Sequence, residues 1–189
     1  THNHTGVRTS MSEKEKRAVN PLRFFTKLNR SIRKGILHRK FGDEWKADGA
    51  LQSRKYKSYD AYLEHQKAKL ATHDFGDYDV QFRSALRERL ATLDIDWPNR
   101  QVLCLAARIG TEVKAFLDLG CRAIGIDLNP GPENEYVVQG DFHNLQFPPN
   151  SMDVVYTNSL DHAFDIDRIA AEVLRVLKPE GGLIIVAVK

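Results

Sequence analysis

From about residue 101 to the end of the chain, short apolar runs alternate with stretches whose apolar residues recur every three or four positions. Short runs rich in branched aliphatic side chains are typical of buried strands, and the wider spacing is typical of helices that cover them. This alternation predicts an α/β domain with a doubly wound, mostly parallel sheet. Strands are expected at 101–105, 122–127, 136–139, 152–157 and 182–188, helices at 111–119 and about 165–177, and a short or irregular crossover around 142–148.

The first half of the chain carries helical patterns. Apolar residues spaced by three and four between Lys and Arg predict a basic amphipathic helix over 21–41. Two further helices are expected over 58–70 and 77–93, before Asp96-Trp97-Pro98-Asn99 breaks the pattern. Residues 1–20 are polar and aperiodic, and we expect them to be disordered. The predicted organisation is a disordered segment at 1–20, a helical region at 21–96 and an α/β core at 97–189.

The formal net charge of +3 conceals an uneven distribution. Residues 1–60 contain 15 Lys and Arg against 6 Asp and Glu, whereas the rest of the chain contains 13 against 19. A basic segment attracts an anionic partner, such as nucleic acid or a membrane surface, or it forms an ordinary solvated helix face. The sequence leaves both interpretations open.

Membrane, secretion and metal signals are weak or missing in this sequence. It has no uninterrupted run of about 18 apolar residues, and residues 1–6 lack the apolar core of a signal peptide. We therefore expect a cytoplasmic protein without a transmembrane segment. Cys104 and Cys121 lack the spacing of a zinc site, so we expect reduced thiols and no metal site.

Candidate binding residues gather where the predicted strands end. In an open parallel sheet, a ligand sits beyond the carboxyl ends of the strands, beside the turn from the first strand into the first helix. Gly110 closes that turn, and Asp127 ends the next strand. A carboxylate at this second position can accept hydrogen bonds from both hydroxyls of a ribose. The alternative for Asp127 is a helix cap or a turn residue.

The third and fourth predicted strands also end in polar residues. Asp141 with Phe142 suits an adenine ring, because the carboxylate can accept from the exocyclic amine while the aromatic ring covers the base. Asn158, Asp161 and His162 follow the fourth strand. His162 is a candidate general base. The alternative for His162 is helix capping or packing.

Three segments in this order carry a resemblance to a known family. They are Gly-Ile-Asp-Leu-Asn-Pro at 125–130, Gly-Asp-Phe-His at 140–143 with Ser-Met-Asp-Val-Val-Tyr-Thr-Asn at 151–158, and Glu-Val-Leu-Arg-Val-Leu-Lys-Pro-Glu-Gly-Gly at 172–182. Over about residues 101–188 the chain resembles the class I, Rossmann-like S-adenosylmethionine-dependent methyltransferases. The resemblance implies S-adenosyl-L-methionine as cofactor and methyl transfer as activity.

The resemblance also implies roles for single residues. Asp127 would hold the ribose hydroxyls, while Asp141 and Phe142 would hold the adenine and Leu128 would pack against it. Asn158 would lie near the methionine part of the cofactor. Together with the first loop and the start of the following helix, the expected cofactor-binding residues are Ala106, Arg108, Gly110, Thr111, Asp127, Leu128, Asp141, Phe142 and Asn158.

The first loop departs from the family's pattern. The usual acidic residue of the first strand is Cys104 here, and two of the three usual glycines are Ala106 and Arg108, so that only Gly110 remains. A residue with a Cβ is strained at positive φ and crowds a ligand, which would weaken cofactor binding if the loop keeps its shape. Arg108 either reaches the cofactor's carboxylate through a charge-assisted bond or lies on the surface.

Three functions are compatible with these residues. The chain is an active methyltransferase, a degenerate and non-catalytic cofactor-binding protein that regulates or scaffolds, or a nicotinamide-dependent oxidoreductase. The third fits worst because the fingerprint GxGxxG is missing. Methyl transfer depends mainly on positioning, so the lack of a catalytic triad excludes nothing. The methyl acceptor stays unidentified, and Trp45, Tyr56, Tyr59 and Tyr62 either line its pocket or pack helices.

The last predicted strand is followed by a single residue, whereas family members continue with a helix and an antiparallel hairpin. A sheet that stops here leaves an apolar edge strand unprotected. We therefore expect either a fragment or a shortened protein that pairs this edge with a partner or a second copy.

Overall fold

The computed structural model describes residues 36, 39–40, 45–48, 51–69 and 77–186. The segment predicted to be disordered at 1–20, most of the predicted basic helix at 21–41 and the side chain of Trp45 lie outside the described residues. The anionic partner of that helix therefore stays a prediction. Within the described ranges, no helix is long and apolar enough to cross a membrane.

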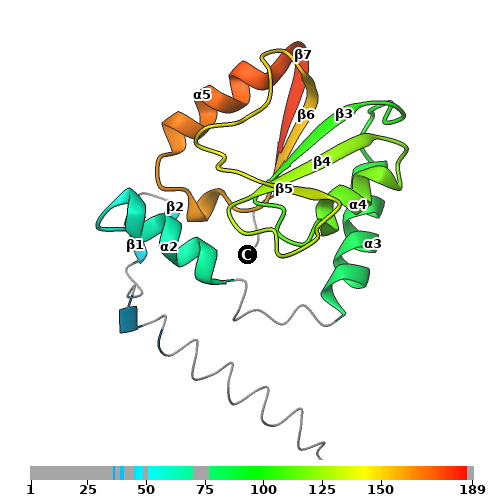
Figure 1. The fold of residues 1–189 in the computed structure, drawn as a ribbon. Helices are drawn as coiled ribbons and strands as arrows, with labels where there is room; N and C mark the ends of the chain where they lie inside the picture. Colours follow the sequence, from blue (N-terminus) through cyan, green and yellow to red (C-terminus); the bar gives the residue numbers. More distant parts are fainter. Residues whose placement is uncertain (1–35, 37–38, 41–44, 49–50, 70–76, 187–189) are drawn as a thin grey trace, which may run out of the picture.

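Five parallel strands form one sheet in the order β5-β4-β3-β6-β7. The predicted doubly wound α/β fold is confirmed. The strand order reverses at β3, which has β4 on one side and β6 on the other, so the ligand crevice of such a sheet opens at its carboxyl end (Figure 1). The strands are β3 (Gln101–Leu105), β4 (Arg122–Asp127), β5 (Val137–Gln139), β6 (Met152–Thr157) and β7 (Leu177–Ile185).

Helices cover both faces of this sheet (Figure 1). Val102 and Cys104 of β3 pack against α3 (Tyr78–Ala91) and α4 (Thr111–Leu117) on one face of the sheet. Leu103 packs against α5 (Ile166–Val176) on the other face. The alternation arises because successive side chains of a strand point to opposite faces. β3 is buried on both faces, which is why its sequence reads as a continuous apolar run.

The region before the sheet contains a hairpin that the sequence analysis did not predict. β1 (Trp45–Asp48) pairs antiparallel with β2 (Leu51–Arg54). The dipeptide Asp48-Gly49 between two short runs is a hairpin signal, and it was overlooked because the surrounding pattern was interpreted as helical. α2 (Tyr59–Lys69) follows as predicted, and its Tyr62, only 1% exposed, joins the core on the α5 face of the sheet.

β7 begins five residues earlier than the predicted strand at 182–188. Leu177 lies opposite Met152 and Gly182 lies opposite Val154, so residues 178–181 bulge out of the ladder. Within the described part of the sheet β7 is an edge, and Leu183 and Ile185 are about half exposed (44% and 54%). The predicted pairing of this edge with a partner is untested.

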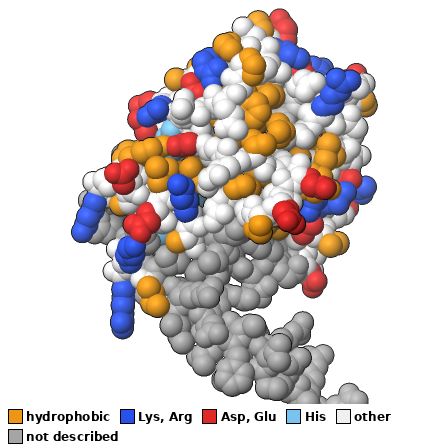
Figure 2. Space-filling view, viewed as in Figure 1, with side chains coloured by type: hydrophobic (Ala, Val, Ile, Leu, Met, Phe, Trp, Pro, Cys, Tyr) orange, Lys and Arg blue, Asp and Glu red, His pale blue; other side chains and the backbone are white. Residues whose placement is uncertain are grey.

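Charges of both signs are intermixed on the face shown in Figure 2, with hydrophobic side chains gathered between them near the centre. The described part of this face therefore has no surface dominated by basic residues. The excess of positive charge in the sequence falls mainly in residues 1–60, most of which the described ranges leave out.

Candidate functional site

The loop that joins β3 to α4 keeps the backbone shape of a glycine-rich loop without its glycines. Ala106 has φ 54°, Arg108 has φ 46° and Gly110 has φ 84°, so every second residue is left-handed. For a residue with a Cβ this conformation costs roughly 1–2 kcal/mol. At Gly110 a Cβ would lie 2.7 Å from Cβ of Tyr136, so this position also lacks the space for a side chain.

Asp127, at the end of β4, stabilises this loop through a hydrogen bond. Its Oδ2 accepts a hydrogen bond from the Arg108 backbone N–H (3.1 Å), and its Oδ1 accepts from the Asn129 N–H (2.8 Å). The turn role that the sequence left open for Asp127 is therefore present. The half-buried carboxylate still lines a pocket, so it can serve a ligand as well.

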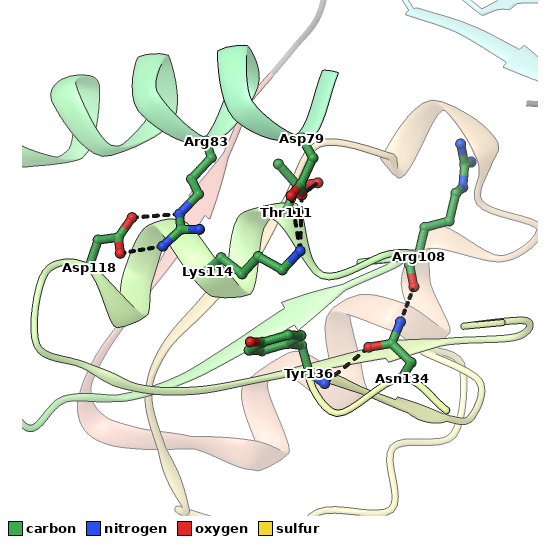
Figure 3. Close-up of polar contacts among 8 residues, drawn as sticks. All are labelled: Asp79, Arg83, Arg108, Thr111, Lys114, Asp118, Asn134 and Tyr136. Carbon is green, nitrogen blue, oxygen red and sulfur yellow. Dashed lines mark hydrogen bonds and ion pairs between the residues drawn. The ribbon is translucent and has the colours of Figure 1, made fainter. Parts of the chain in front are cut away.

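Asn134 fastens the first loop from the side (Figure 3). Its Nδ2 donates to the Arg108 carbonyl (3.0 Å) and to the Pro130 carbonyl (2.8 Å), while its Oδ1 accepts from the Tyr136 N–H (3.0 Å) and from the Val137 N–H (3.1 Å). Sequence reasoning missed this residue, although Asn is typical of a side chain that bonds nearby backbone. The loop shape at Arg108 is thus imposed by neighbouring polar groups.

Thr111 opens α4 and is fully buried against α3 (Figure 3). Its hydroxyl donates to Oδ1 of Asp79 (2.7 Å), and Nζ of Lys114 binds the same carboxylate (3.0 Å to Oδ2). Burial opposes ionisation of Asp79, but the hydrogen bonds from Thr111 and Lys114 outweigh it and lower the pKa of this carboxyl group. The Thr111 hydroxyl therefore belongs to the α3–α4 contact.

A second contact between α3 and α4 supports the same arrangement. The guanidinium of Arg83 donates to both oxygens of Asp118 (2.7 and 2.6 Å). A bidentate pair of this kind fixes orientation as well as distance. α3 thus holds both ends of the helix that carries the first loop (Figure 3).

A pocket with a volume of about 30 Å³ opens beside these strand ends. It brings together five of the nine predicted cofactor-binding residues and the predicted base, whereas Gly110, Thr111, Asp141 and Asn158 are not among the residues that line it. Among the described residues, no three His, Cys, Asp or Glu side chains are arranged to hold a metal ion. The lining residues are Ala106, Arg108, Asp127, Leu128, Phe142 and His162, which were predicted, and Tyr62, Gln66, Asn129 and Ser159, which were not.

Asn158 connects the end of β6 to the start of α4. Its Nδ2 donates to Oε1 of Glu112 (3.1 Å), and its Oδ1 accepts from the Ser159 hydroxyl (2.9 Å). Glu112 is only 7% exposed, and burial raises its pKa. Cys104, which replaces the family's acidic residue, is fully buried, and burial likewise raises the pKa of its thiol.

His162 lies in the short helix η2 (Leu160–His162) after β6 and lines the pocket. Burial and the positive charge of Lys69 lower its pKa to about 4, although Asp161, 3.7 Å away, acts in the opposite direction. At pH 7 the imidazole is therefore neutral and can accept a proton. A conjugate acid of such low pKa makes the imidazole a weak base.

This pKa predicts that mild acid destabilises the protein. Between the folded pKa of about 4 and the unfolded value of about 6.5, the unfolded state binds a proton that the folded state does not. Well above pH 6.5 the histidine is neutral in both states, and the free energy of unfolding is not reduced. As the pH falls below 6.5 the free energy of unfolding decreases, by about 2 kcal/mol at pH 5. Thermal unfolding at pH 8 and pH 5 should differ by about 4–8 °C more in the wild type than in His162→Gln. Equal pH dependence in the two proteins would contradict the lowered pKa.

Part of this chain matches a known protein family. Residues 103–185 match a family model described as a methyltransferase domain. The phthiotriol/phenolphthiotriol dimycocerosates methyltransferase of Mycobacterium leprae is 31% identical, over 60% of this chain and 56% of its own length. The demethylmenaquinone methyltransferase of Thermobifida fusca is 37% identical, over 44% and 42%. The chain thus spans about half the length of these curated relatives.

Among the solved structures that are similar to this chain is an S-adenosylmethionine-dependent methyltransferase from Mesorhizobium loti. It is 23% identical in sequence with a TM-score of 0.44, and the match covers 54% of this chain and 51% of the Mesorhizobium chain. The match to the family model begins within β3 and runs to the end of β7, so it reaches all five strands of the parallel sheet. The predicted resemblance is confirmed for this segment: residues 103–185 match a methyltransferase domain, as expected from the resemblance to the class I, Rossmann-like S-adenosylmethionine-dependent methyltransferases.

Proposed function

We propose that this chain binds S-adenosyl-L-methionine at the carboxyl ends of β3, β4 and β5 and transfers its methyl group to an acceptor by in-line displacement. The observation that carries the proposal is the position of Asp127, whose carboxylate lines the pocket and also holds the first loop. One acidic side chain thereby couples the shape of that loop to the place where a ribose would bind.

The residues present fit this cofactor. The left-handed loop at 106–110 presents backbone to the pocket, and a side chain at Gly110 would have no room. Asp127 would accept from the ribose hydroxyls, and Leu128 and Phe142, both on the pocket wall, would enclose the base. Asp141 would take the exocyclic amine, and Asn158 would lie near the methionine part.

When bound, the cofactor supplies a methyl group on a positively charged sulfur. That group would be available to a lone pair of the acceptor, with the electron pair of the carbon–sulfur bond left on sulfur. The protein lowers the barrier mainly by aligning the two partners, which needs no catalytic side chain. If the acceptor also carries a proton, we assign its removal to the neutral imidazole of His162, which lines the pocket.

A second candidate function is a cofactor-binding protein of the same fold without catalysis. The observation that favours it is the strained first loop, where Ala106 and Arg108 adopt positive φ with a Cβ attached. Such a loop brings side-chain atoms toward a ligand that glycines would leave unobstructed. This candidate predicts cofactor binding without turnover.

Two measurements test these proposals. Isothermal titration with S-adenosylhomocysteine, with NAD as the control ligand, should give a dissociation constant for the first ligand only. Transfer of a labelled methyl group is then followed with trial acceptors chosen from the relatives' names, a demethylmenaquinone and a phthiotriol. Binding without transfer to a broad acceptor panel favours the second candidate. No binding of S-adenosylhomocysteine at millimolar concentration contradicts both.

A further inference from the structure

One of the two carboxylate oxygens of Asp141 is engaged by His143. Oδ1 accepts from the backbone N–H of His143 (2.8 Å) and lies 2.8 Å from Nδ1 of its ring. The Nε2 of the same ring accepts from the Asp165 N–H (3.2 Å), so the proton of a neutral imidazole sits on Nδ1 and points at Oδ1. His143 is 1% exposed and cannot turn away easily. A ligand amine is therefore left with Oδ2.

That second oxygen is already occupied by a residue from α2. The hydroxyl of Tyr59 donates to Oδ2 of Asp141. The Tyr59 ring is stacked on Tyr62 (centroids 5.7 Å apart) and meets the rings of His143 (5.5 Å) and Phe164 (5.2 Å) edge-on. These contacts hold the phenol at the position where the base-binding carboxylate would receive the exocyclic amine.

α2 also fills the neighbouring space. Tyr62 and Gln66, one and two turns beyond Tyr59, line the pocket, and its remaining volume is about 30 Å³. A second polar contact, from Nδ2 of Asn129 to the Lys67 carbonyl (2.6 Å), fastens α2 to the loop after β4. The site is thus closed by α2 on the side of Asp141.

We propose that α2 gates this site and that the Tyr59 hydroxyl competes with the cofactor's exocyclic amine for Oδ2 of Asp141. The proposal rests on the proposed cofactor. Binding then requires the Tyr59–Asp141 hydrogen bond to break and α2 to move, and the free energy of that bond is subtracted from the affinity. A phenol that donates to a charged carboxylate makes a stronger bond than a neutral pair, which is why this single hydroxyl has a measurable effect.

The test is Tyr59→Phe, which removes the hydroxyl and keeps the ring. Isothermal titration should show S-adenosylhomocysteine binding about tenfold more tightly to this variant than to the wild type. Tyr56→Phe is the matched control, because the Tyr56 hydroxyl lies in the same aromatic cluster but contacts His65 (2.9 Å) and Gln66 (3.0 Å) instead of Asp141. It should change the affinity less than twofold. In an Asp141→Ala background, Tyr59→Phe should have no effect.

Hydrogen exchange of α2 gives an independent readout. In the wild type, saturating S-adenosylhomocysteine should speed exchange at the amides of residues 59–66, because the helix leaves its closed position. Equal or weaker binding by Tyr59→Phe, or slower exchange in α2, would overturn the gate and make Tyr59 part of a fixed wall. If neither protein binds the ligand, the proposed cofactor fails and the gate fails with it. A wild type that binds as tightly as Tyr59→Phe removes the gate alone.

Discussion

Replacing Asp127 by Ala should weaken the binding of S-adenosylhomocysteine by about one to two powers of ten. The variant would lack the carboxylate that accepts hydrogen bonds from the ribose hydroxyls, and hydrogen bonds to a charged group contribute roughly 1.5–3 kcal/mol to the free energy of binding. The substitution also removes the acceptors for the Arg108 and Asn129 N–H groups, so the loop loses part of its support. Isothermal titration of the wild type and the variant measures the combined effect.

Two controls separate these contributions. Asp118→Ala removes the same charge from the surface contact with Arg83, on the far side of α4 from the first loop, and should leave the affinity unchanged. Asp127→Asn keeps one oxygen acceptor for the loop but replaces the other with a donor, so its affinity should fall between those of the wild type and Asp127→Ala. Circular dichroism confirms that each variant is folded. Wild-type affinity in a folded Asp127→Ala protein would remove the ribose assignment.

The second large effect is expected for Gly110→Ala, on stability. A left-handed φ of 84° costs an alanine roughly 1–2 kcal/mol. The new Cβ, 2.7 Å from Cβ of Tyr136, adds an overpacking cost of roughly 1–3 kcal/mol. The lower entropy of the unfolded chain returns about 0.4–1 kcal/mol. The free energy of unfolding should therefore fall by about 1–4.6 kcal/mol, seen as a drop of roughly 2–18 °C in the melting temperature.

Gly182→Ala is the matched control for this change. A Cβ at Gly182 would meet no atom within 4 Å, and its φ lies outside the left-handed range. The same gain in the unfolded state then acts without a clash, and the melting temperature should rise by about 1–4 °C above that of the wild type. A drop of similar size in both variants would mean that the cost comes from losing a glycine in general and would contradict the steric account.

The sequence predicted the sheet well because its central strands are buried on two faces. The bounds of β3, β4 and β6 follow from continuous apolar runs such as Gln101–Leu105. Prediction was weaker where a neighbouring strand decides the bounds. β7 starts at Leu177 because that residue pairs with Met152 across a bulge, and nothing in the local sequence reveals that pairing.

The candidate site divides in the same way. The place of Asp127 on the pocket wall could be predicted because parallel strands bring their carboxyl ends to one edge of the sheet, whereas Asp141, which follows β5, does not line the pocket. The contribution of α2 could not be predicted, since a helical pattern does not say which surface the helix will cover. Tyr59 lies 82 positions from Asp141 in the chain, and only the tertiary structure brings them together. For the same reason the sequence left the tyrosines of α2 open between helix packing and an acceptor pocket.

The support of the first loop by Asp127 and Asn134 changes how relatives of this domain should be searched for. Where a loop owes its conformation to glycine, the glycines themselves are its signature. Here the shape at Arg108 is maintained from outside, through its N–H and its carbonyl. A residue other than glycine at position 108 can then keep the loop's shape, so the signature of this loop in the present chain is Asp127 and Asn134 rather than a glycine, and a search for similar loops has to score these two partners.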